Sequence, residues 1–258
     1  MSCAPNAPVF WQRQPRLPLP VMKVLGARVE AALRAPADRA LLVWPLVLGA
    51  PALRAAHPDG IPEPVLLAGA AGMLGPLGVA DPGAAWAEQR LRLPDTAVAG
   101  PGGWAPHPDW EGLASLVSLR LGVALLAMLG QPEDGRYGLA CGVALFNCAL
   151  FHECHDALEP LWQGADGALK TGLQGLIMLA GGFHHLQLHN PGGMTGLWGD
   201  ALAALAPFRD SLATPWGTVA LTGATGPTAE RLAWLDPQHG NPVLDPLWAM
   251  ARPVLELT

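Results

Sequence analysis

The sequence contains few charged residues and very little lysine. Lys, Arg, Asp and Glu make up 14% of the 258 residues, whereas about a quarter is usual. The only lysines are Lys23 and Lys170, the formal net charge is −6, and the basic residues do not cluster. A nucleic-acid-binding surface needs clustered Lys and Arg to displace counterions from the phosphates. We therefore expect no nucleic-acid partner.

The sequence also has no good candidate for a membrane-spanning helix, which needs about 20 consecutive apolar residues. The uncharged stretch Val65–Ala80 falls short of that length and is interrupted by several glycines and by Pro76. At the N-terminus no charged segment precedes an apolar run, as a secretory signal would require. We therefore expect no membrane association, no secretory signal and a cytoplasmic location.

Cysteine is scarce, and the four cysteines form no Cys-x-x-Cys pair, which argues against a zinc ribbon. If Cys141, Cys148 and Cys154 share one helix, the first two lie about 10 Å apart along its axis. A disulfide needs Cα atoms within about 7 Å of each other. We therefore expect free thiols, which suits a reducing compartment.

The N-terminal region begins with a proline-rich segment and continues with helical patterning. Residues 1–21 predict an extended tail, because they contain five prolines. Beyond it, Leu25, Val29 and Leu33 fall on one side of a predicted helix over 22–35.

Shorter helices are predicted for the rest of the N-terminal half. Pro45 and Pro51 should kink or split the helix predicted over 37–56, because proline lacks an amide hydrogen and clashes with the preceding turn. The stretch 94–108 predicts a loop, since Pro, Gly and Asp dominate it. Further helices are predicted over 65–74, over 84–93 and, with Asp109 as the N-terminal signal, over 109–129.

The C-terminal half predicts longer helices, separated from the preceding region by a turn over 132–135. These helices are predicted over 137–159, 168–189 and 194–206. The last forty residues are less regular, with a short strand expected over 216–221 and a final helical turn over 246–257. Thr222–Gly226 predicts a turn more readily than a phosphate-binding loop. No alternation of strands and helices suggests a parallel sheet, so we predict an all-α protein, a multi-helix bundle.

One of the predicted helices carries a polar stripe. His152, His155, Asp156 and Glu159 occupy positions i, i+3, i+4 and i+7, which places them on one face over two turns. Each of these side chains can ligate a metal or carry a proton. The spacing matches neither the His-Glu-x-x-His motif of zinc proteases nor the Glu-x-x-His pairs of di-iron bundles.

The stripe has two interpretations. It is either the solvent-exposed side of an amphipathic helix or part of a buried site. The first is supported by an apolar arc on the same helix, formed by Leu150, Phe151, Cys154, Leu158 and Leu161. The second is supported by residues 138–151, which are apolar on all sides and predict a buried helix. An ordinary solvent face would also use Lys, Arg and Glu in preference to two histidines.

The helix predicted over 168–189 supplies the facing side chains. Gln174 and His185 share one face, and the opposite, apolar face consists of Leu173, Leu176, Leu179, Phe183 and Leu186. Glycines that would let another helix approach closely stand at Gly175, Gly181 and Gly182. Antiparallel packing would bring His185 opposite His155 or Glu159. These three side chains are the predicted metal ligands, and mixed histidine and carboxylate ligation suits zinc, manganese or iron.

Two segments of this region resemble a known family. The first reads Phe146-Asn147-x-Ala149-x-Phe151-x-Glu153-x-His155-Asp156-x-Leu158-Glu159-x-Leu161-Trp162 and is similar to the signature of domain-of-unknown-function family 309. The family's second segment is similar to Leu173-Gln174-Gly175-Leu176-Ile177 with His185-Leu186 and Asn190. The resemblance covers about a quarter of the chain, with both segments in the expected order.

The resemblance implies a fold and a site without an assigned activity. Members of the family are small bundles of about three helices, which here would span 137–212. The chain would then consist of the tail, a helical region of unknown type over 22–130, this bundle, and a C-terminal segment over 213–258 packing on it. The polar positions of the family, implied as candidate catalytic residues, fall on Glu153, His155, Asp156, Glu159, Gln174 and His185.

The sequence departs from the family pattern at three positions. Asp156 stands where Glu is commoner, and His184 stands where an aromatic ring is. Pro160 disfavours helical geometry in the preceding residue, Glu159. A bend there would move Glu159 and Trp162 away from the stripe. His152 lies outside the pattern.

Two functional hypotheses follow. In the first, the chain is a non-catalytic, self-associating helical module whose polar residues form a buried hydrogen-bond network that fixes helix register. In the second, it is a metal-dependent or acid/base enzyme with His155 and His185 as ligands or proton shuttles and neighbouring carboxylates as partners. The second requires both histidines and a carboxylate to converge on one cavity. We favour the first, because most clusters of this kind are structural.

Overall fold

A computed structural model describes residues 10–92, 97–131, 133–235 and 243–258 of the chain. The chain divides into two compact units, one formed by residues 17–126 and the other by residues 1–16 together with 127–258. We call them the N-terminal unit and the C-terminal unit. Each consists of helices with one small antiparallel sheet, which confirms the all-α, multi-helix fold class.

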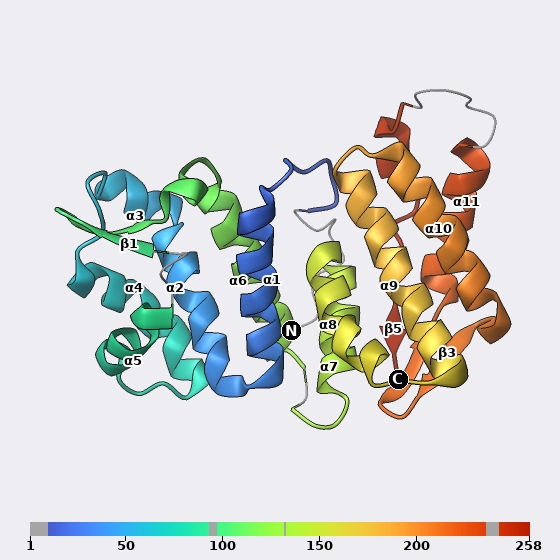
Figure 1. The fold of residues 1–258 in the computed structure, drawn as a ribbon, viewed down its shortest axis with the longest axis horizontal. Helices are drawn as coiled ribbons and strands as arrows, with labels where there is room; N and C mark the ends of the chain where they lie inside the picture. The colour runs from blue at the N-terminus through green and yellow to red at the C-terminus, as the bar shows by residue number, and fades with distance from the viewer. Residues whose placement is uncertain (1–9, 93–96, 132, 236–242) are drawn as a thin grey trace. The chain divides into compact units, whose positions relative to one another are not determined.

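The N-terminal unit is built from short helices and one hairpin (Figure 1, blue to green). Its helices are α1 (Leu19–Arg34), α2 (Ala40–Leu48), α3 (Pro51–Ala56), α4 (Glu63–Leu74), α5 (Pro82–Gln89) and α6 (Ala114–Leu129). Its 3₁₀ helices are Pro36–Arg39, Gly75–Leu77, Arg90–Arg92 and Pro108–Leu113. As expected, Pro51 splits the helix predicted over 37–56, and Pro51 is the first residue of α3. Pro45 does not, because α2 continues through it.

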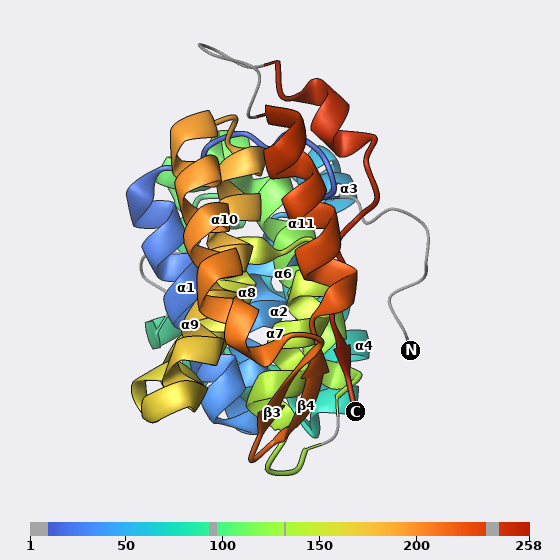
Figure 2. The same cartoon turned by 90° about the vertical axis from the view of Figure 1, so that its right-hand side faces the viewer.

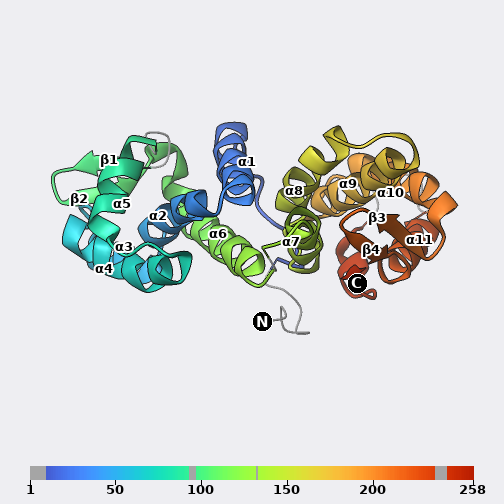
Figure 3. The same cartoon turned by 90° about the horizontal axis from the view of Figure 1, so that it is seen from below.

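The stretch predicted as a loop over 94–108 contains a hairpin, so this prediction was wrong in part. Strand β1 (Ala97–Gly100) pairs antiparallel with β2 (Gly103–Pro106), and residues 94–96 lie outside the described residues. At the turn Gly103 has a φ of 133°, in the region that favours glycine. Figure 3 shows the hairpin next to α5.

Tertiary contacts hold this hairpin in place. The ring of Trp104 on β2 packs edge-on against Trp86 of α5, with 4.8 Å between the centroids. Both indole N–H groups donate to the carboxylate of Glu63 in the first turn of α4. Sequence periodicity did not reveal this strand pair, since its strands are too short to show an alternating pattern.

The C-terminal unit follows on from α6 (Figure 1, green to red). Its helices are α7 (Tyr137–Asn147), α8 (Phe151–Gln163), α9 (Gly167–Gln187), α10 (Pro191–Leu205) and α11 (Thr222–Leu235), with 3₁₀ helices Ala206–Phe208 and Asp245–Trp248. Consecutive helices from α7 to α10 pack against one another, and α11 packs on α10. Figure 2 shows α10 and α11 side by side, with strands β3 (Ser211–Thr214) and β4 (Gly217–Ala220) near one end of α10.

The helix predicted over 137–159 is broken into α7 and α8. The unit over 137–212 therefore has four helices instead of about three. The break occurs because Ala149 adopts a left-handed φ of 57°. The amide of Leu150 donates to the carbonyl of Leu145, and that of Ala149 to the carbonyl of Phe146, the pattern of a Schellman helix end.

The break between α7 and α8 also means that the helix assumed to carry Cys141, Cys148 and Cys154 does not exist as one element. Cys141 lies on α7, Cys148 is the residue that ends it, and Cys154 lies on α8, so the three do not share one helix. All three are nevertheless buried free thiols, as expected. Cys3 lies outside the described residues.

The glycines of α9 admit a close neighbour, and that neighbour is α10. A Cβ at Gly182 would lie 2.3 Å from the Trp198 ring, and one at Gly175 would lie 2.6 Å from Leu205. Both contacts are far too short for a methyl group, so these positions require glycine for this packing. The sequence predicted a close approach at these glycines, but it expected the helix that carries His155 to make it, and that part of the prediction was wrong.

The segment after α10 is more regular than predicted. Strand β4 confirms the strand expected over 216–221 and pairs with both β3 and β5 (Glu256–Leu257). Thr222–Gly226, predicted as a turn, forms the start of α11 instead. The amide and hydroxyl of Thr225 both donate to the carbonyl of Leu221. They therefore stabilise the helix start and are not free to bind a phosphate.

Residues near the two ends of the described chain pack together in the core of the C-terminal unit. Residues 1–9 of the predicted tail lie outside the described residues, but Phe10 is buried and Trp11 packs edge-on against Trp248. The guanidinium of Arg231 donates to four main-chain carbonyls, those of Pro227, Leu247, Met250 and Ala251. It also lies over the rings of Trp11 and Phe183. Burial lowers the pKa of Arg231 to about 10, so the side chain remains charged at neutral pH.

No single helix within the described residues is long and apolar enough to cross a membrane. One strongly bent pair, Glu63–Leu77 with Pro82–Gln89, meets the length and composition requirement when taken together.

Candidate functional site

The polar stripe lies on α8, whose opposite side anchors it in the core. Phe151, Cys154 and Leu158 are fully buried, as the predicted apolar arc requires. The expected bend at Pro160 does not displace Glu159, because α8 continues through the proline to Gln163. Proline removes only its own amide, the donor to the carbonyl of Asp156 four residues earlier.

Asp156 lies between two histidines of the stripe. Its Oδ1 atom is 3.2 Å from Nδ1 of His155, and its Oδ2 atom is 3.7 Å from Nε2 of His152. Only 17% of the Asp156 side chain is exposed, against 26% for His152 and 39% for His155. The stripe is therefore partly covered, and it is not the ordinary solvent face that one interpretation of the sequence expected.

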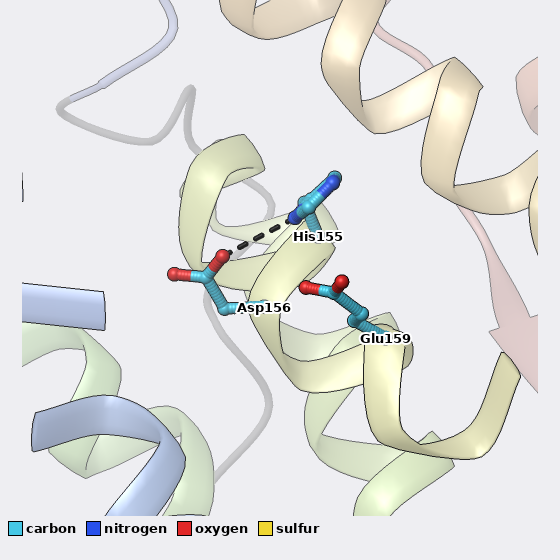
Figure 4. Close-up of side chains that lie close together, drawn as sticks. All are labelled: His155, Asp156 and Glu159. Atoms are coloured by element: carbon cyan, nitrogen blue, oxygen red, sulfur yellow. Dashed lines mark hydrogen bonds and ion pairs between the residues drawn. The ribbon is translucent and has the colours of Figure 1, made fainter. Parts of the chain in front are cut away.

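Glu159 completes a compact group on the same helix. One ligand atom from each of His155, Asp156 and Glu159 lies within 4.8 Å of the others. Figure 4 shows the three side chains projecting from adjacent turns of α8, with the contact between His155 and Asp156 dashed. The carboxylate of Glu159 also accepts a hydrogen bond from the amide of Gln163.

The carboxylates change the acidity of His155. The hydrogen bond to Asp156 is the largest influence, and it raises the pKa of His155 above its usual value. Partial burial opposes this shift, and the negative charges of Asp156 and Glu159 reinforce it. A raised pKa is the expected effect of a neighbouring carboxylate, because the negative charge favours the protonated imidazole.

The histidine of α9 that meets this stripe is His184, not His185. The ring of His184 stacks on that of His152, with 5.2 Å between centroids and 25° between planes. His184 departs from the family pattern, and His152 lies outside it. The pattern alone therefore did not mark them as site residues.

His185 has a different role at the end of α9. Its Nδ1 atom is 2.9 Å from Nδ2 of Asn190, whose Oδ1 accepts from the amide of Gly193 at the start of α10. With its oxygen engaged in this way, the Asn190 amide donates to His185, which requires an unprotonated Nδ1. Burial, followed by the charge of Arg16, lowers the pKa of His185. Both features favour a neutral imidazole.

The remaining two candidates differ in their exposure. Glu153 is buried, with 4% of its surface exposed, whereas Gln174 is exposed on α9. Of the three predicted metal ligands, the structure therefore brings His155 and Glu159 together but does not place His185 in their group.

Two polar residues outside the predicted site have structural roles. The Asn147 side-chain amide donates to the carbonyl of Leu255 at 2.7 Å, and the side-chain oxygen of Asn147 accepts from the amide of Leu255 at 2.9 Å. The Gln187 amide donates to the carbonyls of Ala149 and Phe10, each at 2.8 Å. Asn147 thereby fixes the C-terminal segment on α7, and Gln187 fixes the break between α7 and α8. Their partners lie far away in sequence, so no local signal identified these roles.

Comparison with protein families identifies the part of the chain that carries this stripe. Residues 139–197, from α7 into α10, match the model of the family described as "Domain of unknown function (DUF309)". The chain contains a DUF309-like domain. Comparison with curated proteins found no match, and neither did comparison with solved structures. The DUF309-like domain thus includes α8, α9 and all six candidate residues, and its description assigns no reaction.

Proposed function

We propose that the DUF309-like domain is a non-catalytic helical module in which a polar network fixes the register of α8 against α9. The observation that carries this proposal is the position of Asp156 between His152 and His155, together with the stacking of His152 on His184 of α9. Side chains of this network pair with one another, as a structural role requires. Sliding one helix along the other by a turn would separate the stacked rings.

The surroundings of the candidates are consistent with this role. His185, the second histidine that the enzymatic hypothesis requires, is engaged by Asn190. Metal or acid/base chemistry at His155 remains the second hypothesis, and the compact group on α8 is the observation that favours it.

The proposed location is the cytoplasm, and the proposed partner is a second copy of the chain. The three buried free thiols suit a reducing compartment. Leu119 and Leu126 on α6 are exposed large apolar residues and stand seven residues apart, on the same side of the helix. This apolar stripe supports self-association.

A double-mutant cycle tests the network. His152→Ala, His184→Ala and the double variant should show a coupling free energy of about 0.5–1.5 kcal/mol, the usual value for stacked rings. Unfolding by urea is measured with a chelator present, so that bound metal does not contribute. His57→Ala, in the N-terminal unit, combined with His184→Ala provides the additive control. Additivity of His152→Ala and His184→Ala would refute the register-fixing role.

A further inference from the structure

The same helix face carries a feature that the network does not require. Glu159 takes no part in the stacking of the His152 ring on the His184 ring, and its carboxylate lies near His155 and Asp156. We propose that His155, Asp156 and Glu159 form a binding site for a divalent transition-metal cation. This site goes beyond the proposed module, which does not depend on it.

The spacing of the ligand atoms fits one metal ion. Two ligands on a tetrahedral zinc ion, each about 2.0–2.2 Å from the metal, are roughly 3.4 Å apart. His155 Nδ1 and Asp156 Oδ1 are 3.2 Å apart. One ligand atom from each of the three residues lies within 4.8 Å of the others, so the Glu159 carboxylate has to move closer by side-chain rotation to share one ion with the other two. The protein thus offers three ligands, and water can take the fourth position.

The charges of the group also suit a divalent cation. Two carboxylates with a neutral imidazole neutralise a charge of +2. Histidines lie beside both carboxylate oxygens of Asp156, and Glu159 accepts a hydrogen bond from Gln163. The proton on His155 is the one that metal binding displaces.

The ligand types select among metals. One imidazole nitrogen with carboxylate oxygens suits zinc, manganese or iron, whereas magnesium and calcium prefer oxygen ligands throughout. His152 lies 3.7 Å from the other oxygen of Asp156. It therefore orients that carboxylate without binding the metal itself, as residues that contact metal ligands commonly do. His155 is 39% exposed, which leaves the site accessible to the ion.

Calorimetric titration of the tag-free, chelator-treated full chain with ZnCl₂ and MnCl₂ tests this site. The expected result is one equivalent of bound metal, with affinity reduced at least about tenfold in Glu159→Gln and in His155→Ala. MgCl₂ at the same concentration should not bind. His185→Ala is the matched control and should bind like the wild type, because His185 lies outside the ligand set. Circular dichroism establishes that each variant is folded.

Several outcomes would overturn the site. These are less than one equivalent in the wild type, undiminished binding in Glu159→Gln, equal binding of Mg²⁺, or loss of binding in His185→Ala. The last would favour the ligand set predicted from the sequence. The double-mutant cycle is measured in chelator and is therefore independent of metal binding. Additivity in that cycle, together with one equivalent of metal in the titration, would refute the register-fixing module and leave the metal site standing. Coupling without binding would refute the site alone.

Discussion

Two histidines of the DUF309-like domain, only 30 positions apart in the chain, differ in what they bind. His155 is beside a carboxylate, which favours its protonated form, and the pKa of His155 is raised. His185 accepts a hydrogen bond from an amide, and partial burial, followed by the charge of Arg16, lowers the pKa of His185. From the sequence, both histidines were predicted to be ligands of the same metal or proton shuttles. The structure shows that their neighbours give them opposite charge preferences.

These opposite shifts predict opposite pH dependence of stability. The folded-state pKa of His155 exceeds its unfolded value of about 6.5, so its contribution is complete below pH 6.5 and disappears as pH rises through the folded pKa. For His185 the contribution is present above pH 6.5 and is lost as pH falls through its lowered pKa. In chelator, His155→Asn should therefore lower Tm more at pH 5.5 than at pH 8.5, and His185→Asn more at pH 8.5.

The expected changes are small. His155 is more than a third exposed, so its ion pair is worth less than about 1 kcal/mol. For a domain of this size that corresponds to about 2–4 °C or less in Tm. Differential scanning fluorimetry at the two pH values provides the measurement. The same pH trend in both variants would contradict the opposite assignments.

At the scale of elements, the C-terminal unit has two helix ends with a non-glycine residue in a left-handed conformation and one close helix crossing. Both α7 and α9 end in a residue with a left-handed φ, Ala149 at 57° and His189 at 56°. Glycine is the usual residue at such a position, so neither end was marked in the sequence at that residue. The crossing of α9 and α10 does use glycine, at Gly175 and Gly182.

Alanine substitutions at two glycines should have opposite effects. Gly182→Ala forces a methyl group into the rigid Trp198 ring and should reduce the free energy of unfolding by about 1–3 kcal/mol. Gly196→Ala, on the exposed side of α10 with open space around it, should increase that free energy by about 0.5–1 kcal/mol through helix propensity. Urea denaturation followed by circular dichroism compares them. A neutral Gly182→Ala would show that α9 and α10 do not pack this closely.

At the scale of the whole molecule, the two units differ in a way that concerns assembly. In the C-terminal unit, residues far apart in the sequence pack together, whereas the N-terminal unit has exposed leucines on α6. Within the C-terminal unit, Arg231 connects α11 to the segment around Leu247–Ala251 and lies over Trp11 near the other end of the chain. The unit is therefore assembled from segments that are more than 200 residues apart. On α6, by contrast, Leu119 and Leu126 are left exposed.

From the two exposed leucines on α6 we predict a dimer, and we expect one substitution in this stripe to weaken its association. Burial of one leucine contributes about 1.5–3 kcal/mol, and about 1.4 kcal/mol corresponds to a tenfold change in affinity. Leu126→Gln should therefore weaken self-association at least about tenfold in sedimentation equilibrium. Leu91→Gln, at an exposed leucine outside this stripe, should leave it unchanged. A wild-type chain that sediments as a monomer at all concentrations would disprove self-association.

Much of the fold could be predicted from local pattern alone. Apolar spacing located α1, α9 and α10 to within a few residues, because an amphipathic helix repeats its pattern every turn. It also placed His155, Asp156 and Glu159 on one face of α8, since their spacing fixes that face wherever the helix packs. The hairpin β1–β2 was missed, because its stability comes from Trp86 and Glu63 and not from its own short strands.

The sequence by itself determined several of the helices, the close-approach glycines and the polar face of α8, since each follows from the covalent order of side chains on a regular helix. Only tertiary packing decided that the chain turns at Ala149, where the side-chain amide of Gln187 donates a hydrogen bond to the carbonyl of Ala149. It also decided that α10 occupies the glycine face of α9, so that α8 meets His184 instead of His185. Neighbouring helical residues point about 100° apart, and the choice between them depends on which partner helix fills each side.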